Sequence, residues 1–264
     1  MTTHLIDPSW LQLAFAAGLV LVAIGLSAAR GLGLERDLAM ATVRTFVQLL
    51  AIGQVLGFVF ATASPAMILG ILMLMLVVAA WTVAGRQRRP THTLRALVLA
   101  SLTIGCGLTL LLATELILQI TPWYNPYYLI PLMGMVIGNS LNSATLAVER
   151  LESDLRSGRD QVEALLALGA TSRQAARLPV RSAMKAAMIP IINSMMVVGL
   201  VSLPGMMTGQ ILGGSSPVVA IKYQVLIMYM IAFSTALTAF VLTGLRVRSY
   251  FTPAHQLRDE ALAS

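Results

Sequence analysis

The chain has 264 residues, of which 57% are hydrophobic and only 11% are charged, and its mean hydropathy is +0.81. A water-soluble domain of this length cannot bury so much apolar surface. These values exclude a soluble enzyme and predict an all-α polytopic membrane protein.

Apolar segments follow one another along most of the chain. Crossing a bilayer takes about 20 apolar residues, and about seven segments reach that length. In chain order they are Trp10–Ala29, Leu38–Phe60, Pro65–Ala84, Leu94–Ile120, Leu129–Val148, Ala183–Leu203 and Val218–Leu245. No linker or low-complexity tract separates them, which favours a single transmembrane domain over residues 1–264.

The formal net charge of +7 is distributed unevenly between the two ends of these segments. Basic residues cluster at alternate segment ends, whereas the connections 61–64, 121–128 and 208–217 carry no charge. The positive-inside rule therefore predicts an N-terminus outside the cell and a C-terminus in the cytoplasm. Because the basic residues follow the membrane topology, they indicate lipid rather than nucleic acid as the partner.

A charged connection follows the fifth segment, and its pattern predicts a cytoplasmic pair of helices at about 158–178. Asp160 and Glu163 fit a capping arrangement at the start of the first helix. Gly169 suits a left-handed C-cap, and Thr171 with Gln174 repeats the capping pattern. We expect a short amphipathic helix, a tight turn and a second helix.

The pattern Glu163-Ala164 followed by Gly169 resembles the coupling motif of ABC transporter permeases, which docks on the ATPase subunit. Three longer stretches, 44–50, 131–142 and 202–214, look like the bacterial iron-export ABC permease family of the Fet type. Plant permeases linked to aluminium tolerance are similar to that family.

The resemblance implies a homodimeric permease subunit in the cytoplasmic (inner) membrane, working with two copies of a cytoplasmic ATPase to export iron or a related metal. It also implies that the ATPase contacts are made by Glu163, Ala164, Leu165, Leu166, Gly169 and Arg173.

The chain carries no phosphate-binding loop of its own. Such a loop needs a lysine directly after glycine, and the only lysines, Lys185 and Lys222, follow other residues. We therefore expect a non-catalytic subunit that binds no cofactor, with ATP and Mg bound by the partner ATPase.

Polar residues at membrane depth are costly and usually face the protein interior or a water-filled path. Met135, Asn139 and Asn142 share one face of the fifth segment. They are expected either to lock neighbouring helices together or to line a cation path with weak ligands.

A second group of candidate path residues follows Pro204-Gly205, where the sixth segment is expected to break. Met206, Met207 and Gln210 are predicted to form a gate, a substrate contact or only a helix end. The identity of any metal site is left open.

Two further charged positions have alternative interpretations. Glu115 is expected to be either an outward-facing release-site group or a carboxylate that burial keeps protonated. Arg44 is predicted to pair with Glu149 at a similar depth, or to reach lipid phosphate instead.

Two alternatives to iron export remain. The cargo of an ABC permease could be an organic solute such as a nucleotide sugar, or the chain could be an ATP-independent channel or secondary carrier. Co-purification with an ATPase separates the second alternative from the first.

Overall fold

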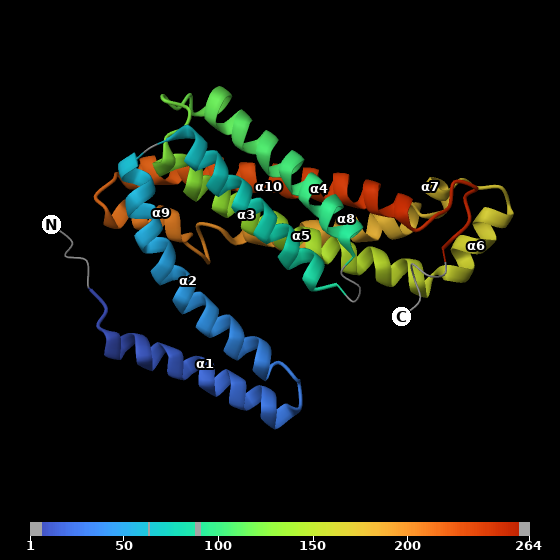
Figure 1. Cartoon of the computed structure of the whole chain (residues 1–264), viewed down its shortest axis with the longest axis horizontal. Coiled ribbons are helices and arrows are strands. Elements are labelled where there is room, and N and C mark those ends of the chain that lie inside the picture. The colour runs from blue at the N-terminus through green and yellow to red at the C-terminus, as the bar shows by residue number, and fades with distance from the viewer. Residues whose placement is uncertain (1–6, 63, 88–90, 259–264) are drawn as a thin grey trace. The chain divides into compact units, whose positions relative to one another are not determined.

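The computed structural model describes residues 7–62, 64–87 and 91–258 (Figure 1). In those ranges every regular element is helical, apart from two isolated β-bridges, which confirms the all-α prediction. Contacts between Cα atoms divide the chain into two compact units, Met1–Ala63 and Ser64–Ser264.

The first unit is a pair of helices, α1 (Trp10–Arg30) and α2 (Glu35–Thr62). The connection between them turns at Gly31 and Gly33, whose φ angles of 61° and 70° favour glycine. The Ser27 hydroxyl donates to Glu35 at 2.7 Å and accepts from the backbone N–H of Leu34 at 3.2 Å, so α1 and α2 are held at this end by local hydrogen bonds.

The second unit holds the remaining helices. They are α3 (Pro65–Gly85), α4 (His92–Leu111), the π-helix η1 (Leu112–Ile117), α5 (Pro126–Ser157), α6 (Arg159–Ala167), α7 (Ser172–Ala175), α8 (Arg177–Val197), α9 (Gly205–Leu212) and α10 (Pro217–Ser249). Helix α10 packs against α4, α5 and α8, and α5 also packs against α3 and α8. Helices α5 and α10 therefore form the centre of this unit.

Small and hydroxylated side chains allow α4, α5 and α10 to approach closely. The hydroxyls of Ser140 and Ser234 lie 2.8 Å apart in the buried core, and Gly105 of α4 faces Thr238 of α10 where no larger side chain would fit. Such close contacts between small residues are typical of helices that pack in a membrane.

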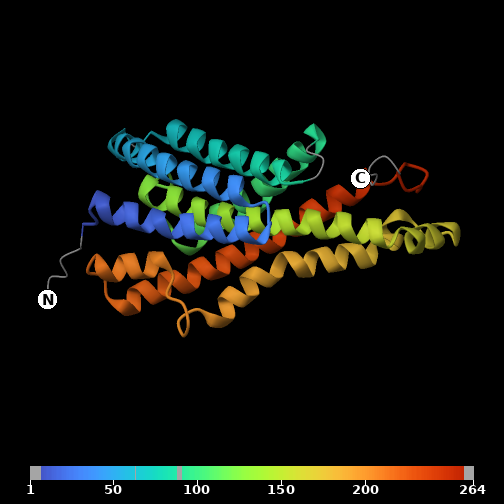
Figure 2. The ribbon, with the colours of Figure 1, turned by 90° about the horizontal axis from the view of Figure 1, so that it is seen from below.

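Among the described residues, six helical stretches are long and apolar enough to cross a membrane: Trp10–Arg30, Glu35–Thr62, Pro65–Gly85, His92–Ile117, Pro126–Ser157 and Pro217–Ser249. The sixth predicted segment, Ala183–Leu203, is not a continuous helix. It ends at Val197, and an irregular connection leads to α9 (Figure 2).

Two residues explain this interruption. Gly199 has a φ of 86°, and Pro204, which has no N–H, precedes the first residue of α9. Figure 2 shows that α8 and α9 follow each other along α10, which both helices contact. The sixth segment is therefore a broken helix.

Candidate partner-docking helices and transport path

The predicted helix pair is present at residues 158–178 as α6, α7 and the start of α8. Gly169 has a φ of 88°, and the N–H groups of Gly169 and Ala170 donate to the carbonyls of Leu166 and Leu165, both at 3.0 Å. This is the Schellman arrangement, so the left-handed C-cap is confirmed.

The cap of the second helix is confirmed as well, but that of the first is wrong. The backbone N–H of Thr171 donates to the Gln174 side chain at 2.8 Å, in a complete capping box. Helix α6 instead begins after Gly158 and has no side-chain cap. Glu163 cannot reach back because it accepts from Arg159 at 2.7 Å, one turn earlier.

The apolar face of α6 is turned into the protein. Val162 is buried in a cluster with Leu151, Leu155 and Tyr250, and Leu165 and Leu166 pack against the same cluster. Glu163 and Ala164 lie on the exposed side, and the Leu168 side chain at the turn is 85% exposed. The surface left for a partner is therefore this polar face together with Leu168, which the sequence pattern did not single out.

The segment after α10 holds the helix pair in place. The Nδ1 atom of His255 lies 2.7 Å from the Ser172 hydroxyl at the start of α7. Phe251 forms an isolated bridge with Leu257, and both pack in the Val162 cluster. The position of α6 and α7 thus depends on residues far away in the sequence.

A network of charged and polar side chains anchors that segment to α5. The Glu152 carboxylate accepts from Arg246 at 2.7 Å and from the Tyr250 hydroxyl at 2.6 Å. The Arg246 guanidinium also lies 4.6 Å from the centre of the Tyr250 ring. Burial raises the pKa of Tyr250 above its ordinary value, although Arg246 acts in the opposite direction, so the hydroxyl stays protonated and donates.

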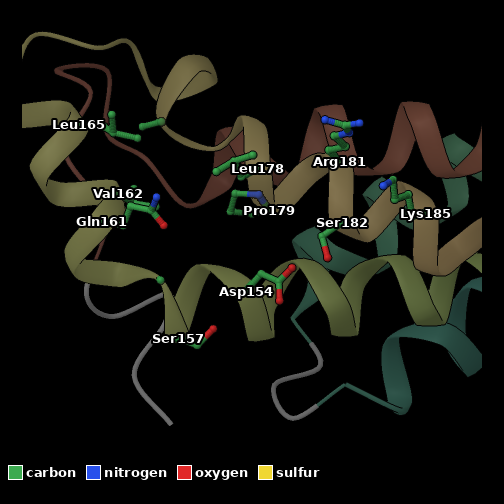
Figure 3. Close-up of a pocket in the computed structure, with 12 residues that line it drawn as sticks. Asp154, Ser157, Gln161, Val162, Leu165, Leu178, Pro179, Arg181, Ser182 and Lys185 are labelled. Carbon is green, nitrogen blue, oxygen red and sulfur yellow. The ribbon is translucent and has the colours of Figure 1, made fainter.

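A polar groove of about 560 Å³ separates the end of α5 and α6 from the start of α8. Figure 3 shows Asp154 of α5 and Ser182 of α8 pointing toward each other across it. Arg150 donates to both of them, at 3.1 and 2.9 Å. Lys185 and Arg181 add positive charge to the α8 wall.

The candidate path residues of α5 share one uncovered face, as the spacing predicts. Asn139 and Asn142 are exposed and Met135 is half-buried, whereas Ser140 is buried. The Asn139 amide donates to the backbone carbonyl of Met135 in its own helix at 2.9 Å. Within the described residues, no hydrogen bond is found from either asparagine to another helix.

The second group of path residues lies in α9, directly after the break. Met206, Met207 and Gln210 are half-buried, and α9 packs on α10. The side-chain oxygen of Gln210 is buried and accepts no hydrogen bond from the part of the chain that the structure describes. The two methionines therefore lie in the first turn of a short helix and not in unwound backbone.

Glu115 and the predicted ion pair are placed as follows. Glu115 lies on the π-helix η1 and its side chain is exposed. Its carboxylate is therefore not buried within this chain. Arg44 belongs to the first unit and Glu149 to the second, and their pairing stays a prediction. Glu149 lines a pocket with Arg86 and Arg156 of its own unit.

Metal ligands do not gather anywhere in the described ranges. No three His, Cys, Asp or Glu side chains there lie close enough to hold a metal ion.

The apolar helices define a multi-pass membrane protein, in which a broken helix and a pair of short helices accompany the long spans. Residues 10–251 match the model of the Uncharacterised protein family (UPF0014), and the chain belongs to that family.

Proteins of bacteria and plants are similar in sequence to this chain over nearly its whole length. A UPF0014 membrane protein of Synechocystis is 40% identical over 97% of this chain and 99% of its own length. The ALUMINUM SENSITIVE 3 protein of Arabidopsis thaliana is 36% identical over 95% of this chain and 90% of its own. The probable iron export permease protein FetB of Escherichia coli is 35% identical over 93% of each chain. No solved structure matches.

Proposed function

We propose that this chain is the membrane-spanning permease subunit of an ABC transporter that exports iron or a related metal from the cytoplasm. The similarity over nearly full length to a probable iron export permease supports the cargo and the direction. The observation that carries the mechanism is the helix pair α6–α7, whose exposed face the chain itself leaves uncovered.

The exposed face of α6 has the chemistry of a docking contact. The exposed Leu168 side chain is an aliphatic anchor for a pocket on a partner, and the exposed Glu163–Arg159 ion pair on α6 gives the contact charges that can orient the partner. The Val162 cluster and the segment after α10 support α6 from behind. A displacement of α6 by the partner would therefore be transmitted to α5, α8 and α10 together.

The partner in this proposal is a cytoplasmic ATPase, because the chain has no lysine after glycine with which to bind phosphate. ATP and Mg bind to that subunit, and this chain catalyses no reaction. Two permease copies and two ATPase copies complete the transporter in this proposal. The N-terminus lies outside and the C-terminus, with the helix pair, in the cytoplasm.

The cargo path in this proposal runs along the uncovered face of α5 and past α9. Amide oxygens of Asn139 and Asn142 and the thioethers of Met206 and Met207 offer weak, exchangeable ligands to a cation. The helix break before Pro204 leaves backbone carbonyls outside the helical hydrogen-bond pattern, and their oxygens are further ligands for a cation. Weak sites in series suit transport better than one tight site.

The deciding experiment is co-purification with the cognate ATPase and measurement of ATP-driven iron transport in proteoliposomes. Glu163→Lys and Leu168→Asp should each weaken ATPase binding about tenfold or more, since loss of a central contact costs about 2 kcal/mol. Leu168→Met keeps an apolar anchor and serves as the matched control. Normal ATPase binding and transport in both charged variants would refute the docking role of α6.

A further inference from the structure

A basic cleft lies between the start of α8 and the end of α10, and apart from Arg173, which the resemblance assigns to an ATPase contact, its lining residues have no role in the proposed transport cycle. It encloses about 640 Å³. Arg173 of α7 and Arg177 and Arg181 of α8 line one side. The apolar side chains of Phe240 and Leu245 line the α10 side together with Arg248.

Within the described ranges, the arginines of the cleft have no partner of opposite charge. All four side chains are exposed, and in the described part of the chain none has a hydrogen bond or an ion pair to an acidic group. Arg177 and Arg181 are one turn apart on α8, where like charges repel. Four guanidinium groups around one hollow fit an anion with several oxygens, such as a phosphate.

The apolar wall determines what kind of phosphate fits. Phe240 and Leu245 belong to α10, one of the helices apolar enough to cross the membrane, and the Phe240 side chain is 67% exposed. A small soluble phosphate compound has no apolar part that this wall could bind. A cytoplasmic ATPase cannot follow α10 into the bilayer, whereas an acyl chain lies there naturally.

We propose that the basic cleft binds an anionic phospholipid of the cytoplasmic leaflet, with the phosphate at Arg177 and Arg248 and an acyl chain along Phe240 and Leu245. Basic pockets between helices at the cytoplasmic surface are a known form of lipid recognition. Because α8 leads directly from the helix pair into the broken helix, a bound lipid would hold both against α10. The residues proposed to hold the lipid, Arg177, Arg248, Phe240 and Leu245, include none of those assigned to the cargo path or to the ATPase contact.

The test measures lipid binding to the purified full-length protein by native mass spectrometry. Wild type should retain phosphatidylglycerol, and Arg177→Gln combined with Arg248→Gln should weaken that binding about 25-fold, because each basic residue near the surface contributes roughly fivefold. Arg30→Gln with Arg36→Gln removes the same charge from the first unit and should bind normally. Arg177→Lys combined with Arg248→Lys should retain most of the binding and controls for misfolding.

Two further probes separate the sources of the phosphate. Phosphatidylcholine should bind equally weakly to wild type and to the double glutamine variant, and soluble glycerol phosphate should not compete at millimolar concentration. Equal retention of phosphatidylglycerol by wild type and the double glutamine variant would overturn the proposal. So would efficient competition by glycerol phosphate, or a loss of ATPase binding in that variant with lipid binding unchanged.

Discussion

The Glu152 network allows a quantitative test of how the helix pair is supported. Glu152→Gln removes the charge that faces Arg246, whose side chain is 11% exposed, while the Glu152 side chain is 17% exposed. Removing one member of a buried pair leaves the other charge uncompensated, at a cost of about 3 kcal/mol. For a unit of this size that corresponds to a fall in Tm of roughly 6–12 °C.

A double-mutant cycle separates the pair from the general effect of changing either residue. Glu152→Gln combined with Arg246→Met removes both charges and keeps apolar volume beside the Tyr250 ring, so much of the lost stability should return. Thermal unfolding in detergent is the measurement.

The matched control is Arg150→Gln, which breaks a pair with Asp154 whose arginine side chain is 53% exposed. Such an exposed pair is worth less than about 1 kcal/mol. If Glu152→Gln lowers the Tm no more than Arg150→Gln does, the network does not support the helix pair.

Two other predictions concern residues identified from the sequence. Replacing Met206 and Met207 together by leucine keeps volume and apolarity but removes the sulfur atoms, so iron transport should fall while ATPase binding stays normal. An unchanged rate and half-saturation for iron would make both methionines packing residues. Neutralising Arg44 or Glu149 alone should impair transport, and exchanging the two charges should restore part of it. Strictly additive losses in the double variant would mean that the two side chains do not meet.

Local signals predicted the turn between α6 and α7 correctly. Gly169 adopts a positive φ, and Thr171 and Gln174 cap the next helix, because these features depend only on residues within one helical turn. The predicted cap by Asp160 does not form, and the hydropathy of the sequence does not reveal why. Helix α5 continues to Ser157, well beyond the apolar part that ends at Val148, so α6 begins directly after Gly158.

Contacts between distant parts of the chain could not be read from local patterns. Tyr250 meets Glu152 across 98 positions, and His255 meets Ser172 across 83. The same limit applies to Leu165 and Leu166, which the resemblance assigns to the ATPase contact and which are half-buried in the structure. Their spacing predicts an apolar face, but the segment after α10 decides that this face packs inward.

The last prediction distinguishes the two interpretations of Asn139. Its amide bonds within its own helix and its side chain is exposed, so Asn139→Leu should leave the Tm within about 2 °C of wild type and should reduce iron transport. Ser140→Val is the contrasting variant, because it breaks a buried hydroxyl pair and should lower the Tm clearly. If Asn139→Leu destabilises the protein as much as Ser140→Val does, Asn139 locks helices together in the assembled transporter. A stable protein with impaired transport would instead place the α5 face on the cargo path, because within the described residues the Asn139 amide bonds only to its own helix, which leaves the exposed amide oxygen to meet water or cargo within the membrane.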